Sequence, residues 1–292
     1  RLSEVAPDLA KQTVADAVTI GVMSQPEDIC LLRHDGSGKN AFKNPLSFRY
    51  LDDNFIESDA VKIGKTFMDY LKKTKDPRIH VYCSLKDGNT EFDKQFGLPN
   101  GYDSHTIADA PSGSFVGLEN TSNFNINTIL RLDAPTIFLM PSETKLLLAE
   151  AVLRNWTNGN AEGLYKEAIT SSMKEQEIAY GTQGKITDEE IETYLAQNLF
   201  STANNTEKLQ IIGEQYWVAT FINGYESYAN WRRTGYPKLI PTNYSGSMSP
   251  GVIPTRLPYP TDEYSINRAN VDTANQQQGA DKVTTHIWWD ID

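Results

Sequence analysis

The sequence predicts a mostly α-helical fold, in which tetratricopeptide-like helix pairs carry an irregular, loop-rich region. Residues 142–235 contain successive segments with apolar residues at helical spacing, each bounded by start and stop signals. Residues 86–135 are instead rich in Gly, Asn, Asp, Ser and Pro. Because so long an irregular stretch is usually either functional or poorly ordered, we treat it as the candidate ligand region. The 292 residues could hold one large domain or two, and we expect a single domain to span the chain.

Composition excludes several classes of protein. The formal net charge of −11 repels phosphate groups, so nucleic acid is not expected as a partner. Hydrophobic residues make up 39% of the chain, as in globular proteins, and no apolar run approaches the roughly 18 residues of a membrane helix. Cys30 and Cys83 are too few for a disulfide framework or a thiolate metal site, and we expect both to be buried thiols.

No cofactor is expected. The four histidines are scattered and lack the spacing of a zinc site. Residues 32–40 contain Gly-Ser-Gly-Lys without the spacing of a phosphate-binding loop, and we expect a tight turn there. The sequence leaves open whether carboxylates and carbonyls hold a structural calcium ion, because residue spacing does not reveal such a site.

The first third of the chain is predicted to hold two helices and a strand. One helix begins near Pro7, whose fixed φ suits a first turn. Its inward residues are expected to be Val14, Ala17 and Val18. The second helix is capped by Ser58 and stops before Pro77. Its inward residues are expected to be Val61, Phe67, Met68 and Leu71. Residues 78–85 alternate enough for a short strand.

Two amphipathic helices follow and predict an antiparallel pair. Ser142 is expected to cap the first, and Gly159 to lie just beyond its end. Asn160 is expected to cap the second, which closes at Gly181. The size of the pair and its small-residue positions resemble a tetratricopeptide unit, although two helices alone do not establish an array.

The remainder of the helical scaffold, which we place at residues 142–235, holds two further helices. Thr187 and Glu190 form a capping box at the start of the shorter one. The longer one starts at Asn205 or Thr206 and ends at Gly235, with Pro237 just beyond.

Four aromatic side chains in the last turns of that long helix are spaced to share one face. They are Phe221, Tyr225, Tyr228 and Trp231. A stripe at helical spacing is more often core than binding site, so we expect these rings to be buried. Arg232 and Arg233 lie in the last turn, where they suit the helix dipole and can form ion pairs. Residues 237–292 contain six prolines between 237 and 260 and are expected to form an extended closing segment.

A series of motifs resembles the SusD/RagB family, the glycan-binding surface lipoproteins of Bacteroidota. The resemblance spans nearly the whole chain and is strongest over residues 137–292. Its motifs, in order, are SETKLLLAEAVLRNW, AEGLYKEAITSSM, FINGYESYANWRRTGYP, RLPYPTDEYSINRANVDTA and GADKVTTHIWWD. Each is modestly specific alone, whereas five in this order form a strong match.

The resemblance implies a SusD-like α-α superhelix and a binding protein rather than an enzyme. Members of the family capture oligosaccharides or polysaccharides for a SusC-like TonB-dependent transporter, at the cell outer membrane, as surface-exposed lipoproteins. Their signal peptide, lipidated N-terminal cysteine and early helices would lie upstream of Arg1. The chain is therefore expected to be the C-terminal portion of a longer protein.

Candidate ligand residues are chosen from the irregular stretch, because aromatic side chains on loops have less reason to be core than those on helices. A sugar offers flat C–H faces and hydroxyl groups, which aromatic rings and short polar side chains can contact. The candidates are Phe96, Tyr102, Asp103 and Phe115.

Two other classes of function stay open at this point. A glycoside hydrolase needs two carboxylates about 5 to 9.5 Å apart, and the 38 acidic residues offer many pairs that sequence spacing cannot sort. A helical-repeat module could instead bind a peptide in its groove. Retention of an oligosaccharide without cleavage would distinguish a glycan-binding protein from both.

Overall fold

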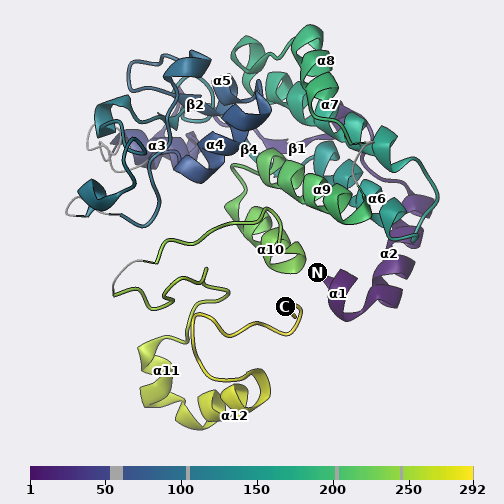
Figure 1. Cartoon of the computed structure of the whole chain (residues 1–292), viewed down its shortest axis with the longest axis vertical. Helices are drawn as coiled ribbons and strands as arrows, with labels where there is room; N and C mark the ends of the chain where they lie inside the picture. Colours follow the sequence, from purple (N-terminus) through teal and green to yellow (C-terminus); the bar gives the residue numbers. More distant parts are fainter. Residues whose placement is uncertain (53–61, 103–105, 201–203, 244–245, 292) are drawn as a thin grey trace.

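The computed structural model describes residues 1–52, 62–102, 106–200, 204–243 and 246–291. Helices dominate these residues and strands are few and short, which confirms the predicted mostly helical fold. A broad helical body forms most of the molecule, and a small lobe lies apart from it toward the C-terminal end (Figure 1). No helix within the described ranges is long and apolar enough to cross a membrane.

The chain begins with α1 (Leu2–Val5) and α2 (Pro7–Ile20) at the edge of the body (Figure 1). Pro7 takes the first position of α2, as predicted. Only Ala10 of this helix is buried, and Ala17 and Val18 are exposed. The expectation that Ala17 and Val18 turn inward was wrong, because a helix at the edge has neighbours on one side only.

Two short antiparallel pairs of strands tie distant parts of the chain together. β1 (Cys30–Leu32) pairs with β4 (Thr136–Leu139), and β2 (Cys83–Ser84) pairs with β3 (Asn123–Phe124). Cys83 is buried as expected, but Cys30 is exposed on its edge strand, which corrects the prediction of two buried thiols. Between β1 and the next helix, the Asp35 carboxylate accepts bonds from the backbone of Ser37 and Gly38, and this confirms the tight turn.

Three helices follow: α3 (Pro45–Asp52), α4 (Lys65–Thr74) and α5 (Ile79–Tyr82). Phe67, Met68 and Leu71 of α4 are buried, as predicted. The expected cap Ser58 and the inward Val61 lie outside the described residues. The strand predicted over 78–85 was wrong, since a helical turn fills most of it and only β2 remains. The Asp76 carboxylate accepts a bond from the backbone N–H of Arg78, which starts this turn.

The predicted antiparallel pair consists of α6 (Pro141–Leu153) and α7 (Ala161–Tyr180), which pack against each other (Figure 1). The Asn160 side chain accepts a bond from Gly163 N at 3.1 Å, which confirms it as the cap of α7. Ser142 is not a cap, because its N–H and hydroxyl both donate to the buried Glu175 carboxylate. Asn155, with φ 59°, takes the left-handed position expected at Gly159, since α6 already ends at Leu153.

The scaffold continues with α8 (Asp188–Gln197), α9 (Asn205–Ala219) and α10 (Gly224–Thr234). Thr187 and Glu190 form the predicted capping box. The single long helix predicted to run to residue 233 is in fact two helices. The Asn223 side chain accepts a bond from Glu226 N and thereby starts a new helix after the break.

The break separates the four aromatic rings that were expected on one buried face. Phe221 lies in the break and packs against the core. Tyr225 is 93% exposed, so its predicted burial was wrong. Tyr228 and Trp231 stack on each other at the half-buried face of α10, with centroids 6.0 Å apart. Because α10 starts a new helix after the break, residues before and after the break do not share one helical face.

The end of α10 behaves as the sequence predicts. Gly235 ends the helix in a left-handed conformation with φ 67°. Arg233 is buried and both of its terminal nitrogens donate to Glu150 of α6, at 2.6 and 2.7 Å. Arg232 donates to the backbone oxygen of Thr255 and lies 4.6 Å from the ring centroid of Trp289. Arg233 also donates to the Ser3 hydroxyl at 3.0 Å, so these two arginines join the scaffold to both ends of the chain.

The closing segment is less extended than predicted, since it contains α11 (Thr261–Ile266) and α12 (Arg268–Gln278), which form the separate lobe (Figure 1). Asp281 holds the lobe together: its carboxylate accepts bonds from Arg256, from the backbone of Tyr259 and from the hydroxyl of Tyr264. Because Asp281 binds Arg256, Tyr259 and Tyr264, the segment folds back on itself after its prolines and is not extended as predicted. Near the C-terminal end, Trp288 is 68% exposed.

An ion pair with no solvent access lies in the middle of the body. The Arg78 guanidinium donates to both oxygens of Asp76, at 2.9 and 2.5 Å, and both side chains have zero exposure. Arg78 also donates to Ser172 of α7 and to Gln215 of α9. The turn between α4 and α5 is thus fixed against two scaffold helices by charge-assisted hydrogen bonds.

Candidate functional site

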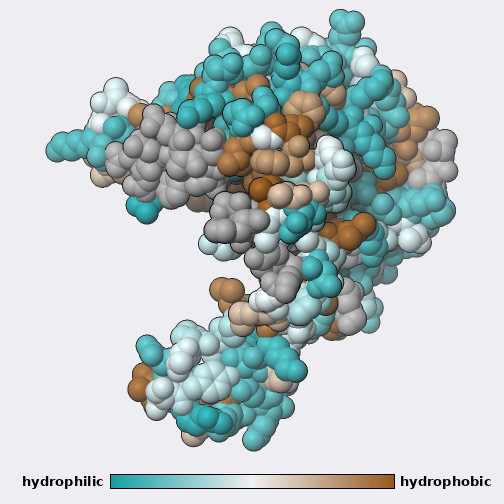
Figure 2. All heavy atoms as spheres, turned by 60° about the vertical axis from the view of Figure 1, so that its left-hand side comes forward, coloured by the Kyte–Doolittle hydropathy of each residue, from teal (hydrophilic) through white to brown (hydrophobic). Residues whose placement is uncertain are grey.

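A large hollow lies where the loop-rich region meets the segment that follows α10. Its volume is about 990 Å³, within the range typical of ligand sites. One wall comes from residues 64–69 and the turn 99–102, and the opposite wall from the described residues of the segment 239–254. Figure 2 shows an open concavity between the body and the C-terminal lobe, and the second wall is the segment that joins them.

Two aromatic rings form the floor of this pocket. Phe67 of α4 is 6% exposed and stacks on Phe221 with centroids 4.3 Å apart. Trp217 of α9 meets Phe67 edge to face at 4.9 Å and meets Tyr70 at 5.8 Å. Because each ring is held by the others, the floor is rigid. Phe67 is nearly buried, so the half-buried Trp217 supplies most of the aromatic surface that a ligand can contact.

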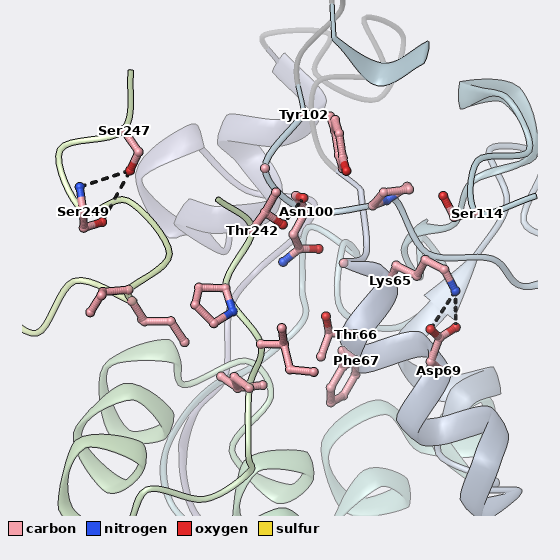
Figure 3. A pocket seen from close by; sticks show the side chains of 18 of the residues that line it. Lys65, Thr66, Phe67, Asp69, Asn100, Tyr102, Ser114, Thr242, Ser247 and Ser249 are labelled. Atoms are coloured by element: carbon pink, nitrogen blue, oxygen red, sulfur yellow. Dashed lines mark hydrogen bonds and ion pairs between the residues drawn. The ribbon is translucent and has the colours of Figure 1, made fainter. Parts of the chain in front are cut away.

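Neutral polar side chains surround the floor. Figure 3 shows Asn100 beside Thr242, with Tyr102 beyond them and Thr66 near Phe67. The Thr242 hydroxyl donates to the backbone oxygen of Asn100 at 2.7 Å, and this bond joins the two walls. Hydroxyls and amides can donate and accept, which suits a ligand that carries many hydroxyl groups.

The charges in the described lining are those of Lys65 and Asp69, one turn apart on α4. The Lys65 ammonium donates to both carboxylate oxygens of Asp69, at 2.8 and 2.6 Å (Figure 3). Each charge is therefore neutralised by the other before any ligand arrives.

Gly101 permits the close approach of the two walls. Its φ is +82°, and a Cβ at this position would collide with the Thr242 side chain. We expect Gly101→Ala to lower the free energy of unfolding by about 1–3 kcal/mol, because alanine meets both backbone strain and this collision. Urea unfolding measures the change. Gly113→Ala is the matched control, since Gly113 also has a positive φ but nothing lies within 4 Å of its added Cβ. Equal losses of unfolding free energy in the two variants would mean that the collision with Thr242 does not contribute to the destabilisation.

The structure places the four sequence candidates differently. Tyr102 lines the pocket. Phe96 lies outside its lining and is 40% exposed, with the Lys72 ammonium 4.2 Å from its ring centroid. Phe115 is half-buried and lies next to Ser114, which lines the pocket, but is itself outside the lining. Asp103 falls outside the described residues. Their roles in binding stay predictions.

Sequence reasoning missed most of the other pocket residues. Trp217 was assigned to the scaffold because it lies within a helix. Lys65 and Asp69 fell inside a helix that was predicted to start at Ser58, whereas α4 starts at Lys65. Residues 239–254 were treated as a closing segment. One available signal was the cluster of apolar residues and prolines over 239–254, which is unusual for an exposed connection.

A second hollow of about 600 Å³ lies between α8 and residues 75–92. Phe92 is half-buried there, while Tyr194 is 2% exposed and presents almost no ring surface. This hollow therefore lacks the combination of aromatic floor and neutral polar walls found in the larger pocket. Neither hollow holds a metal centre, since the described residues contain no group of three or more His, Cys, Asp or Glu side chains arranged for one.

The fold and the pocket define a helical scaffold protein with a loop-walled pocket and no assembled metal centre among its described residues. The family described as "starch-binding associating with outer membrane" matches residues 1–260, and the chain belongs to this SusD-like family. No curated protein is similar enough to count as a relative.

Solved structures share the fold over the whole chain. A chitin-binding protein is 29% identical, with a TM-score of 0.80, and the match covers 100% of this chain and 61% of that protein. A SusD-like protein described as Bacteroidetes AC2a is 25% identical, with a TM-score of 0.80 and coverage of 100% and 67%. A SusD homologue from Bacteroides uniformis ATCC 8492 is 25% identical, with a TM-score of 0.77 and coverage of 100% and 62%. The chain thus spans about three fifths of the length of the first of these structures.

Proposed function

We propose that this chain binds an oligosaccharide in the pocket between α4, the turn 99–102 and residues 239–254. The observation that carries the proposal is the combination of a rigid aromatic floor, Phe67 and Trp217, with neutral hydroxyl and amide side chains around it. Aromatic faces match the C–H faces of a sugar ring, and the surrounding groups match its hydroxyls. The family description and the chitin-binding relative support the same class of ligand.

We propose capture without cleavage. Hydrolysis of a glycosidic bond ordinarily requires two carboxylates facing the scissile bond. The described lining of the pocket holds one carboxylate, Asp69, and it is bound to Lys65. Because the described lining contains no pair of carboxylates that could act as acid and base, it supports a binding protein rather than a glycoside hydrolase.

The proposed setting is the surface of the outer membrane. The family description includes association with this membrane. We propose that the complete protein is a surface-exposed lipoprotein held by an N-terminal lipid, and that it delivers glycan to a SusC-like TonB-dependent transporter. Co-purification of the transporter with the complete protein from native membranes would test this partner, and its absence from a stable complex would contradict the proposal.

Replacing Tyr102 with alanine should weaken binding of the preferred oligosaccharide about tenfold, since a lost aromatic contact of about 1.4 kcal/mol corresponds to that factor. Calorimetry against a panel of plant, host and microbial glycans measures the dissociation constant. Tyr225→Ala is the matched control, because Tyr225 is 93% exposed and outside the pocket. The proposed site is wrong if both variants bind like the unaltered protein. Chromatography of the recovered glycan should show no shortened products.

A further inference from the structure

The charge of the pocket restricts its ligand. Lys65 and Asp69 are the charged side chains of the described lining, and they form a bidentate pair with each other. An acidic sugar that approached the ammonium would lie close to the Asp69 carboxylate, whose negative charge repels its own. The chain as a whole carries −11, which also repels acidic glycans. The site is therefore built for a neutral ligand.

The two walls differ in chemistry. The wall on the side of α4 offers the polar side chains of Thr66, Asn100 and Tyr102. The segment 239–254 brings six aliphatic and proline side chains to the opposite wall, together with the hydroxyls of Thr242, Ser247 and Ser249. The apolar six are Leu239, Ile240, Pro241, Val252, Ile253 and Pro254. Ile240 is 92% exposed and Val252 is 48% exposed, so this apolar surface is open to a ligand.

An unsubstituted sugar fits such a pocket poorly on one side. Its hydroxyls lose their hydrogen bonds to water when they face aliphatic side chains, and they gain no partner in return. A methyl group has no hydrogen bonds to lose and gains from leaving water. An acetyl substituent combines a methyl group for the aliphatic wall with a carbonyl that accepts hydrogen bonds, and Asn100, Thr66 and Tyr102 in the lining carry donors.

We propose that this pocket selects neutral oligosaccharides that carry acetyl groups, with the methyl of the acetyl group against the aliphatic wall around Ile240 and Val252. The acetyl group can be part of an acetamido group or of an acetyl ester. This inference rests on the proposed function and names the substrate class of the same site.

The test compares ligands that share a backbone and differ in whether they carry acetyl groups. Chitohexaose and cellohexaose share a β-1,4-linked backbone and differ at C2, and acetylated xylan fragments can be compared with the same fragments after mild alkaline deacetylation. We expect the acetylated member of at least one pair to bind about fourfold more tightly for each buried methyl group, as measured by calorimetry. Preference in the first pair identifies acetamido groups, and preference in the second identifies acetyl esters.

Ile240→Ser makes the test specific to the wall. Because Ile240 is 92% exposed, the substitution removes little packing, and it should bring the dissociation constants of the acetylated and unacetylated ligands closer together. Ile266→Ser on α11 is the control, since Ile266 is 83% exposed and outside the pocket, and it should leave the preference intact.

The results separate this inference from the function on which it rests. Equal or tighter binding of the unacetylated ligands, or tightest binding of an acidic glycan such as oligogalacturonate, overturns the inference and leaves oligosaccharide binding standing. An acetyl preference that survives Ile240→Ser also overturns it. Failure to bind any member of the glycan panel contradicts the proposed function, and the inference falls with it.

Discussion

Replacing Arg78 with methionine should lower the free energy of unfolding by about 3–5 kcal/mol, which is the usual cost of leaving one partner of a buried ion pair uncompensated. Asp76 and Arg78 both have zero exposure. Methionine fills much of the volume but supplies none of the donors that the Asp76 carboxylate, Ser172 and Gln215 now use. Urea unfolding, followed by circular dichroism, measures the loss.

Two further variants identify the cause of that loss. Arg268→Met removes an arginine from an exposed i, i+4 pair with Asp272 on α12, and should change stability by about 0.5 kcal/mol or less. The double variant Asp76→Asn, Arg78→Met removes the orphaned charge and should recover part of the stability. If Arg78→Met costs no more than Arg268→Met, the buried pair does not hold the α4–α5 turn to the scaffold.

Raising the pH from 5 to 8 should destabilise the protein by about 2–3 kcal/mol through Glu143 alone. Burial, together with the nearby Glu226 and Glu175 carboxylates, raises the pKa of Glu143 to about 7. The folded protein therefore holds this proton more tightly than the unfolded chain. The stabilising contribution is complete below about pH 4.5 and disappears as the pH rises through about 7, so stability falls with rising pH.

Glu143→Gln removes this titration while keeping the shape of the protonated side chain. We expect unfolding of the variant to depend less on pH between 5 and 8 than that of the unaltered protein, with urea titrations at each pH as the measurement. Some dependence should remain, because burial also raises the pKa of Glu175 to about 7. Glu189→Gln on the exposed face of α8 is the control and should leave the pH profile unchanged. A variant profile that matches that of the unaltered protein would contradict the assignment.

Local signals predicted the helices well where the cap and the helix are neighbours in sequence. Asn160, Thr187 and Gly235 do what their positions indicate, because a cap needs only the next few residues. The break after α9 carried such a signal too, since Asn223 is followed three residues later by Glu226, and Glu226 N donates to the Asn223 side chain. The continuous apolar pattern obscured it, and the burial of Tyr225 was therefore mispredicted.

The features that sequence analysis failed to predict depend on contacts between residues that are distant in the sequence. The turn at 76–82 is helical because Arg78 reaches Ser172 and Gln215, and no local pattern contains that information. The pocket has the same origin. Tyr102 was found because it lies on a loop, whereas Trp217 and the wall at 239–254 belong to the site only after folding brings them to residues 64–69.

The two sides of the pocket differ in how well they tolerate amino-acid substitutions. Phe67 belongs both to the pocket floor and to the buried core, so a new side chain there would alter ligand contact and folding stability together. Ile240 and Val252 lie outside the described core and are exposed. Descendants of such a protein can therefore acquire new ligands by exchanging residues 239–254 while the floor stays fixed. Directed evolution of specificity should begin with libraries in that segment.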